Sequence, residues 1–131
     1  MPVVAPPLPD LPLNLASLER ELRHTIAGEV HFDSLYRALY STDASLYQIA
    51  PLGVVFPRST ADVQAVVRLC AQHGIPILPR GSGTSLGGQT VAAAVVLDFT
   101  RHMQAVLEVN ADERWVRVQP GVILDELNAQ L

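Results

Sequence analysis

A glycine-rich stretch, Ile75 to Val91, constrains this chain more than any other part of its sequence. It places glycines at positions 81, 83, 87 and 88 directly after a short apolar strand. Glycine alone reaches left-handed backbone conformations without a steric penalty, and it lets main-chain N–H groups approach an anion closely. The same stretch adds one fixed positive charge and three hydroxyls, from Arg80, Ser82, Thr84 and Ser85. This set of donors is suited to a diphosphate, and an ordinary surface turn is the competing interpretation.

Two known phosphate-binding patterns nearly match the loop, and both fail. The run Gly83 to Thr90 fits G-x-x-x-x-G-K-[ST], except that Gln89 stands in the place of the lysine. An uncharged amide cannot stabilise β- and γ-phosphates as an ammonium does, so the sequence argues against a nucleotide triphosphatase. The dinucleotide fingerprint G-x-G-x-x-G fails because, counted from Gly81, Leu86 occupies the position of the third glycine.

The run Pro79 to Leu86, followed by Gly88-Gln89 and by Val96 to Phe99, resembles the flavin-binding segment of FAD-linked oxidases of the vanillyl-alcohol oxidase/PCMH type. The most similar branch contains the glycolate oxidase D subunit, D-lactate dehydrogenase and D-2-hydroxyglutarate dehydrogenase. Further matching pieces extend the resemblance from about Phe32 to the last residue: Ser41 to Ser45 with Tyr47, Val54 to Pro57 with Asp62-Val63, Arg101-His102, and Val118 to Val122.

The resemblance implies a set of cofactor-binding residues. Main-chain amides of the loop would hold the FAD diphosphate, Gly87 and Gly88 would let the chain pass beneath the cofactor, and the 120–121 pair would line the flavin. The expected site residues are Pro79, Arg80, Gly81, Ser82, Gly83, Thr84, Ser85, Leu86, Gly87, Gly88, Pro120 and Gly121. In branches that attach the flavin covalently through this loop, a histidine stands where this chain has Thr84, so we expect FAD to be held non-covalently.

The activity implied by the resemblance is that of an FAD-dependent 2-hydroxy acid dehydrogenase or oxidase. Such an enzyme transfers a hydride from the C2 carbon of D-lactate, glycolate or D-2-hydroxyglutarate to FAD. The catalytic residues of such relatives lie farther along the chain than Leu131, and their respiratory electron acceptors would place the parent protein at the inner face of a membrane. Two alternatives stay open from the residues: a module that binds a free nucleotide or sugar phosphate without redox chemistry, and a structural subunit that binds nothing.

Composition narrows the classes of partner and compartment. The formal net charge is −4, from nine basic and thirteen acidic residues, which argues against nucleic-acid binding. Cys70 is the only cysteine, and with His73 it makes at most half of a ligand pair, so we expect no metal site. The longest apolar run, Val91 to Leu97, is far shorter than the roughly 20 residues that span a bilayer. No secretory signal is evident, and we expect a cytoplasmic protein.

The sequence divides into three segments: a disordered, proline-rich arm over residues 1–13, a helical N-terminal segment over 14–50, and the N-terminal part of an FAD-binding PCMH-type domain over 51–131. Periodicity predicts a helix from Leu15 to Ala27 with Gly28 as its C-cap. A second, short helix over 33–39 would turn Leu35, Tyr36 and Leu39 inward.

The third segment has the pattern of an α+β fold with a parallel βαβ unit, a phosphate loop and a β-hairpin. A buried strand, 54–56, precedes a helix that Ser59 or Thr60 would cap and Gly74 would end. Its inward positions would be Val63, Val66, Val67 and Cys70. Strands follow at 75–78, parallel to the first, and at 95–99, and then a hairpin over 105–110 and 114–119.

Several single residues have more than one interpretation. Asp43 and Ser45 match the resembling family, and an Asx-type turn explains them equally well. Arg101 has either the cofactor or Asp98 as its partner, and His102 is expected to be a surface or capping residue. Beyond Gly121 an apolar helical pattern, with Leu124, Leu127 and Leu131, runs to the last residue without a cap. We therefore expect a fragment that is catalytically silent alone and that self-associates through an uncovered core face.

Overall fold

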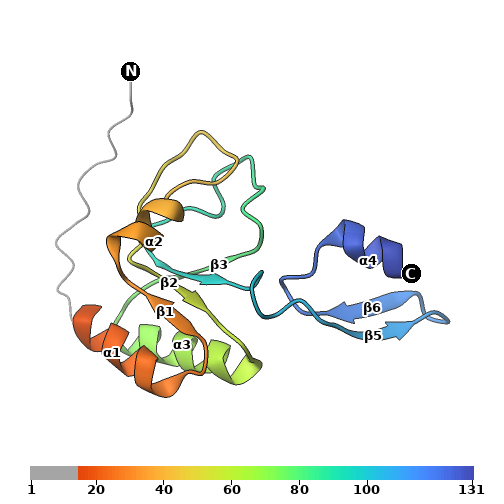
Figure 1. Cartoon of the computed structure of the whole chain (residues 1–131), viewed down its shortest axis with the longest axis horizontal. Coiled ribbons are helices and arrows are strands. Elements are labelled where there is room, and N and C mark those ends of the chain that lie inside the picture. Colours follow the sequence, from red (N-terminus) through yellow and green to blue (C-terminus); the bar gives the residue numbers. More distant parts are fainter. Residues whose placement is uncertain (1–14) are drawn as a thin grey trace.

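The computed structural model describes residues 15–131, and a four-stranded mixed sheet forms the centre of its main body (Figure 1). The expected arm over 1–13 lies outside the described residues. The helices are α1 Leu15–Thr25, α2 Ser34–Leu39, α3 Thr60–Gln72 and α4 Leu124–Gln130. The strands are β1 Glu29–His31, β2 Gly53–Phe56, β3 Ile77–Arg80, β4 Val95–Asp98, β5 Val106–Asn110 and β6 Trp115–Val118.

The sheet has the strand order β1-β2-β4-β3. Strands β2 and β3 both pair with β4 in parallel, so the predicted parallel βαβ unit is confirmed, with β4 inserted between its two strands. Strand β1 pairs with β2 antiparallel, with Val30 opposite Val55. Every residue of β2 and β4 is buried, as expected for central strands that are covered on both faces.

Helices α1 and α3 lie side by side on one face of the sheet and bury the main core (Figure 1). Leu18 and Leu22 of α1 and Val66 and Cys70 of α3 are almost wholly buried there. The predicted N-cap of α3 is confirmed, because the Ser59 hydroxyl accepts a hydrogen bond from the Asp62 N–H at 3.2 Å. Val67 was expected inward and is 43% exposed, since the inward stripe is filled by its neighbours at helical spacing.

The other face of the sheet carries a smaller cluster beneath α2. Val54, Phe56 and Val96 form it, and Tyr36, Tyr40 and Leu78 pack against it. The expectation that Leu35 and Leu39 point inward is wrong, because they are 62% and 60% exposed. A helix as short as α2 presents only one narrow stripe to the sheet, and Tyr36 occupies it.

Gly28 serves packing rather than helix capping. Helix α1 ends at Thr25, and Gly28 does not have the positive φ of a left-handed C-cap. A Cβ at this position would lie 2.3 Å from the carbonyl oxygen of Phe56, so β2 passes too close to the chain here for any side chain.

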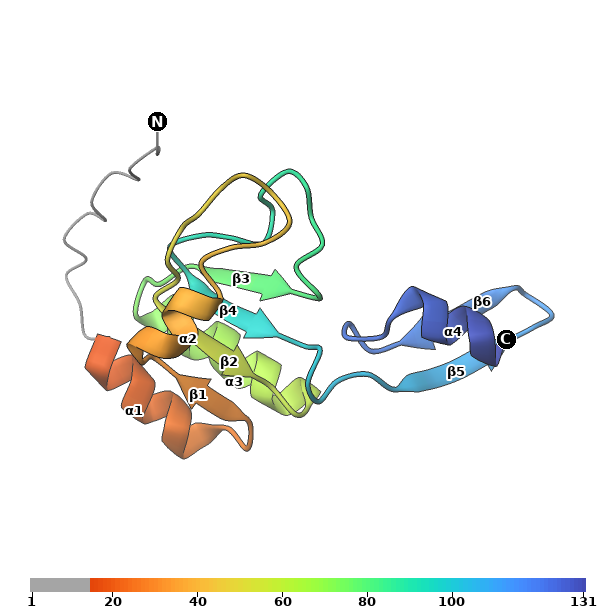
Figure 2. The same ribbon diagram turned by 45° about the horizontal axis from the view of Figure 1, so that its top comes forward.

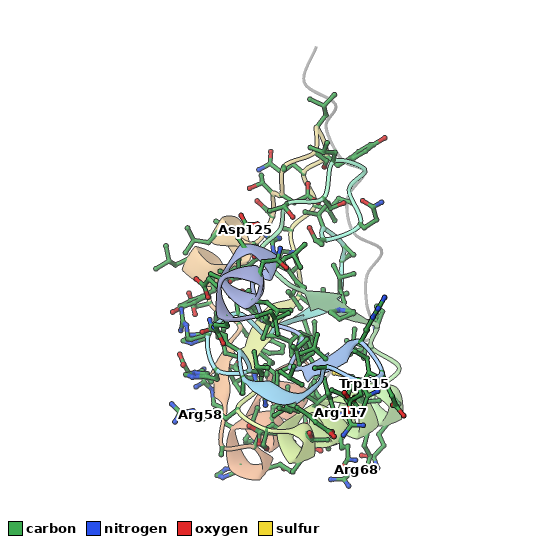
Figure 3. All side chains as sticks on the ribbon, turned by 90° about the vertical axis from the view of Figure 1, so that its right-hand side faces the viewer. Arg58, Arg68, Trp115, Arg117 and Asp125 are labelled. Atoms are coloured by element: carbon green, nitrogen blue, oxygen red, sulfur yellow. The ribbon has the colours of Figure 1, made fainter. Side chains whose placement is uncertain are left out.

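The remaining elements, β5, β6 and α4, extend away from the sheet, and α4 lies along the hairpin (Figures 1 and 2). The predicted hairpin is confirmed, with Val109 opposite Val116 and an irregularity in register between Val106 and Glu108. Figure 3 views the molecule from this end, where the Arg117 guanidinium lies 5.4 Å from the centre of the Trp115 ring. Leu127 is the buried residue of α4.

Candidate functional site

The glycine-rich loop begins where β3 ends, at the carboxyl edge of the parallel strands. Residues 81–94 connect β3 to its parallel neighbour β4 with no intervening helix. We call residues 80–90 the phosphate loop. Figure 2 shows it extending beyond the sheet beside the connection between α2 and β2. Ligands of parallel sheets bind outside the carboxyl ends of the strands, which is where this loop lies.

The main-chain N–H groups of the phosphate loop after Arg80 are without acceptors in the described chain. Within residues 15–131, no N–H group of residues 81–90 donates a hydrogen bond to another part of the chain. Gly83 and Gly88 have positive φ values of 70° and 79°. A Cβ at Gly81 would meet nothing within 4 Å, so that stretch of backbone faces open space. In proteins, phosphates are often bound by unpaired main-chain N–H groups where right-handed and left-handed backbone conformations follow one another.

Arg80 supplies a positive charge from inside the loop. Its guanidinium donates to the carbonyl oxygen of Thr90 at 3.1 Å and lies 5.0 Å from the centre of the Tyr40 ring. A Cβ at Gly83 would lie 2.5 Å from one of its nitrogens. Among the described residues Arg80 forms no ion pair with a carboxylate, so its charge is available to an anion held by the loop.

A second segment, residues 41–48, lies against the phosphate loop. The Ala44 N–H donates to the Gly83 carbonyl oxygen at 3.0 Å, and the Thr90 hydroxyl donates to Asp43 Oδ2 at 2.8 Å. The Ser45 N–H donates to Asp43 Oδ1 at 2.8 Å, so the Asx-type turn is confirmed. Hydrogen bonds from Ser45, and after them from Thr90, lower the pKa of Asp43 to about 2. Asp43 is therefore ionised at neutral pH.

Tyr40 and Asp98 join the loop to the sheet. The Tyr40 hydroxyl donates to Asp98 Oδ2 at 2.5 Å, and the Thr100 N–H and hydroxyl both donate to Asp98 Oδ1. Burial, with the Asp98 carboxylate as a further cause, raises the pKa of Tyr40. The phenol stays protonated at neutral pH, and its ring supports the Arg80 guanidinium from below.

Arg101 and His102 both contact Glu29 of β1. Arg101 donates to Glu29 Oε2 at 2.7 Å and lies 3.8 Å from the centre of the Phe56 ring. His102 Nε2 is 2.6 Å from Glu29 Oε1. The hydrogen bond from His102 is the largest cause that lowers the pKa of Glu29 to about 2, with His31 and Arg101 contributing. Asp98 is thus not the partner of Arg101. Arg101 and His102 instead connect the turn after β4 to Glu29 of β1.

Gly121 is connected to the phosphate loop through Phe99. The Phe99 N–H donates to the Arg80 carbonyl oxygen at 3.2 Å. A Cβ at Gly121 would lie 2.2 Å from the carbonyl oxygen of Phe99, and the Gly121 N–H donates to the Met103 carbonyl oxygen at 2.9 Å. The structure therefore brings the contiguous positions 79–88 together and places the 120–121 pair beside the end of β4.

Reasoning from sequence missed the role of segment 41–48 and of Tyr40. In sequence, the 41–45 run and Tyr47 resemble the family, and a local turn explains Asp43 equally well. Only the pairing of Ala44 with Gly83 and of Asp43 with Thr90 shows that the two loops form one unit. No sequence signal relates Tyr40 to Arg80, because their contact depends on where α2 sits on the sheet.

Comparison with known proteins decides the family. A family model described as an FAD binding domain matches residues 51–131. The chain belongs to this family. D-2-hydroxyglutarate dehydrogenase of Escherichia coli (strain K12) is 44% identical over 131 residues, covering 97% of this chain and 13% of that protein. Glycolate oxidase subunit GlcD of Bacillus subtilis (strain 168) is 40% identical over 110 residues, covering 79% of this chain and 23% of that protein.

Solved structures agree with this family assignment. The 4-ethylphenol oxidase from Gulosibacter chungangensis superposes with a TM-score of 0.77 and 28% identity, over 88% of this chain and 24% of that one. The expected PCMH-type FAD-binding fold is confirmed, as is the cofactor class, FAD. The chain spans between about an eighth and a quarter of the relatives that it matches.

Within residues 15–131 no group of three or more histidine, cysteine, aspartate or glutamate side chains is arranged to hold a metal ion. None of the helices in the same range is long and apolar enough to cross a bilayer.

Proposed function

We propose that the phosphate loop binds the diphosphate of FAD in a flavin-dependent oxidoreductase that oxidises a 2-hydroxy acid. The observation that carries the proposal is the run of unpaired main-chain N–H groups over 81–90, in a chain that belongs to an FAD-binding family. The names of the relatives, D-2-hydroxyglutarate dehydrogenase and glycolate oxidase subunit GlcD, favour the 2-hydroxy acid class.

In this proposal the chain's own residues bind and orient the cofactor. The amides of 81–85 donate to the diphosphate oxygens, and Arg80 balances their charge from within the loop. Gly87 and Gly88 let the backbone pass close to the ligand, and Pro120-Gly121 lines the flavin side. The bound flavin would accept the hydride from the C2 carbon of the hydroxy acid.

The parts of the chain that carry this function are also proposed. The family match begins at residue 51, and we assign 51–131 to the FAD-binding domain. Segment 14–50 would serve it as support, because α1 packs on α3 and β1 pairs with β2.

The proposal is tested with the protein that carries this chain, purified and supplied with FAD. We expect flavin absorbance in the protein fraction after gel filtration, and loss of that absorbance when D-2-hydroxyglutarate, D-lactate or glycolate is added without oxygen. Flavin that none of the three hydroxy acids reduces would contradict the substrate class. Equal binding of ADP and FAD, without reduction of the flavin by any hydroxy acid, would favour the nucleotide-binding module instead.

The electron acceptor and the location belong to the same proposal. A respiratory acceptor would place the protein on the cytoplasmic side of a membrane, attached through a partner. Fractionation of cells, followed by hydroxy-acid-dependent reduction of a quinone analogue by the membrane fraction, tests this. Activity found only with a soluble acceptor would contradict it.

A further inference from the structure

Segment 41–48 contacts the phosphate loop at both of the loop's ends. Near the start, the Ala44 N–H donates to the Gly83 carbonyl oxygen at 3.0 Å. Near the end, Asp43 Oδ2 accepts from the Thr90 hydroxyl at 2.8 Å. Between these points the Tyr47 ring lies so close to Gly88 that a Cβ there would be 2.6 Å from it.

The segment is itself held in shape. The Asx-type turn at Asp43 is followed by a hydrogen bond from the Tyr47 N–H to the Ser45 hydroxyl at 3.1 Å. A bridge between Thr42 and Gln48 closes its two ends. The segment is thus a preformed unit, and the phosphate loop, whose amides have no partners in the described chain, is the less constrained of the two.

We propose that segment 41–48 is a clamp that holds the phosphate loop in its binding conformation, with Asp43 as a positioning residue for FAD. This inference rests on the proposed function of the loop. Amides that are already fixed in place bind an anion more tightly, because less conformational entropy is lost on binding. Asp43 does not touch the diphosphate in this proposal and acts through Thr90.

The charge of Asp43 separates positioning from electrostatic attraction. A carboxylate next to a diphosphate site repels the ligand, so its charge cannot explain a favourable effect on FAD binding. The hydrogen bonds that its two oxygens accept can explain a favourable effect on FAD binding. In asparagine the amide oxygen can still accept from the Ser45 N–H, and the amide N–H can donate to the Thr90 hydroxyl oxygen, so both contacts remain while the repulsion is removed. Replacement by alanine removes both hydrogen bonds as well as the charge.

Two readouts test the clamp on the full chain. The first is trypsin cleavage of the ligand-free protein at Arg80-Gly81, compared with cleavage at Arg114-Trp115 in the hairpin turn as an internal reference. The second is affinity for FAD and for riboflavin, which lacks the diphosphate. We expect Asp43→Ala to raise relative cleavage at Arg80 and weaken FAD binding, each about tenfold, and to leave riboflavin binding unchanged.

The controls separate the clamp from general destabilisation and from the proposed function. Asp43→Asn should keep the wild-type cleavage ratio and bind FAD at least as tightly, and Leu46→Ala, at a fully exposed position of the same segment, should change neither readout. If Asp43→Ala does not fold, Thr90→Val takes its place. Wild-type values in both alanine and valine variants, or an asparagine variant as weak as the alanine one, would overturn the clamp.

Failure of the wild-type protein to bind FAD would overturn the proposed function and the effect on affinity. The cleavage ratio would then still decide whether segment 41–48 orders the loop. An unchanged ratio in Asp43→Ala would overturn that as well.

Discussion

At Gly83 the backbone has a φ of 70°, and a Cβ would lie 2.5 Å from a guanidinium nitrogen of Arg80. The left-handed conformation strains any side chain at this position, and a Cβ would also displace the Arg80 guanidinium from where it lies. The carbonyl oxygen of Gly83 also accepts a hydrogen bond from the Ala44 N–H, which further constrains the backbone of this residue. Substitutions here test the site more directly than substitutions of the loop's exposed hydroxyls.

We expect Gly83→Val to abolish FAD retention, because a β-branched side chain blocks both the backbone conformation and the seat of Arg80. Gly74→Val is the matched control, since Gly74 has a φ of 66° and nothing within 4 Å of its Cβ position. Both variants should lose on the order of 1–2 kcal/mol of stability from left-handed strain. Flavin absorbance after gel filtration should be lost only in the first, and normal flavin content there would contradict the site.

Thr84 leads to a prediction about attachment. A hydroxyl does not form the histidyl link found in covalent branches, so acid denaturation should release all the flavin into the supernatant. A denaturing gel viewed for flavin fluorescence is the complementary measurement. A fluorescent protein band would show that another residue forms a covalent bond to the cofactor.

At the scale of elements, the most specific connection between distant strands is the one centred on Glu29. It joins β1 to Arg101 and His102, which follow β4, and His31 of β1 lies 3.4 Å from the same carboxylate. One arginine and two histidines therefore surround the Glu29 carboxylate. The contact supports the edge strand β1, which is only three residues long.

We expect the contacts of Glu29 to make the free energy of unfolding depend on pH in the acidic range. The folded-state pKa of Glu29 is lowered from 4.5 to about 2, so its contribution is fully present above about pH 4.5 and is lost as the pH falls toward 2. Urea unfolding at several pH values measures this. Glu29→Gln should flatten the loss of stability between pH 4.5 and 2, whereas Glu108→Gln, which removes an exposed ion pair in the hairpin, should leave it unchanged.

For the whole molecule, the main feature is the contrast between a well-buried sheet core and an apolar surface on β5, β6 and α4. Leu107, Val109 and Leu124 are 57%, 52% and 66% exposed. Val109, Trp115, Val116 and Leu131 supply most of the lining of a pocket between the hairpin and the end of α4, to which Asn110 and Arg114 also contribute. Apolar surface gathered in this way is typical of a contact region.

The isolated chain should therefore self-associate through the hairpin and α4. Analytical ultracentrifugation should show a sedimentation coefficient that rises with concentration, and the double change Leu107→Glu with Leu124→Glu should abolish the rise. Leu35→Glu, at an exposed leucine of α2, is the control and should have no effect. A wild-type chain that sediments as a monomer at every concentration would contradict the prediction.

Much of the fold follows from local patterns in the sequence. Apolar runs located β2 and β4, helical spacing located α3, and the Ser59 cap and Gly74 defined its ends within one or two residues. The glycines at 81, 83, 87 and 88 indicated an anion-binding loop, since few other structures require them together. These features depend on backbone conformation and short-range hydrogen bonds, which neighbouring residues determine.

The tertiary structure alone decided which distant groups meet. It placed β4 between β2 and β3, set Gly28 against Phe56, and gave Arg101 to Glu29 instead of Asp98. It also joined Asp43 to Thr90 across 47 positions of sequence, which holds the two loops together. Such pairings depend on how helices and strands pack, and that packing minimises the free energy of the whole core, so no local pattern can specify them.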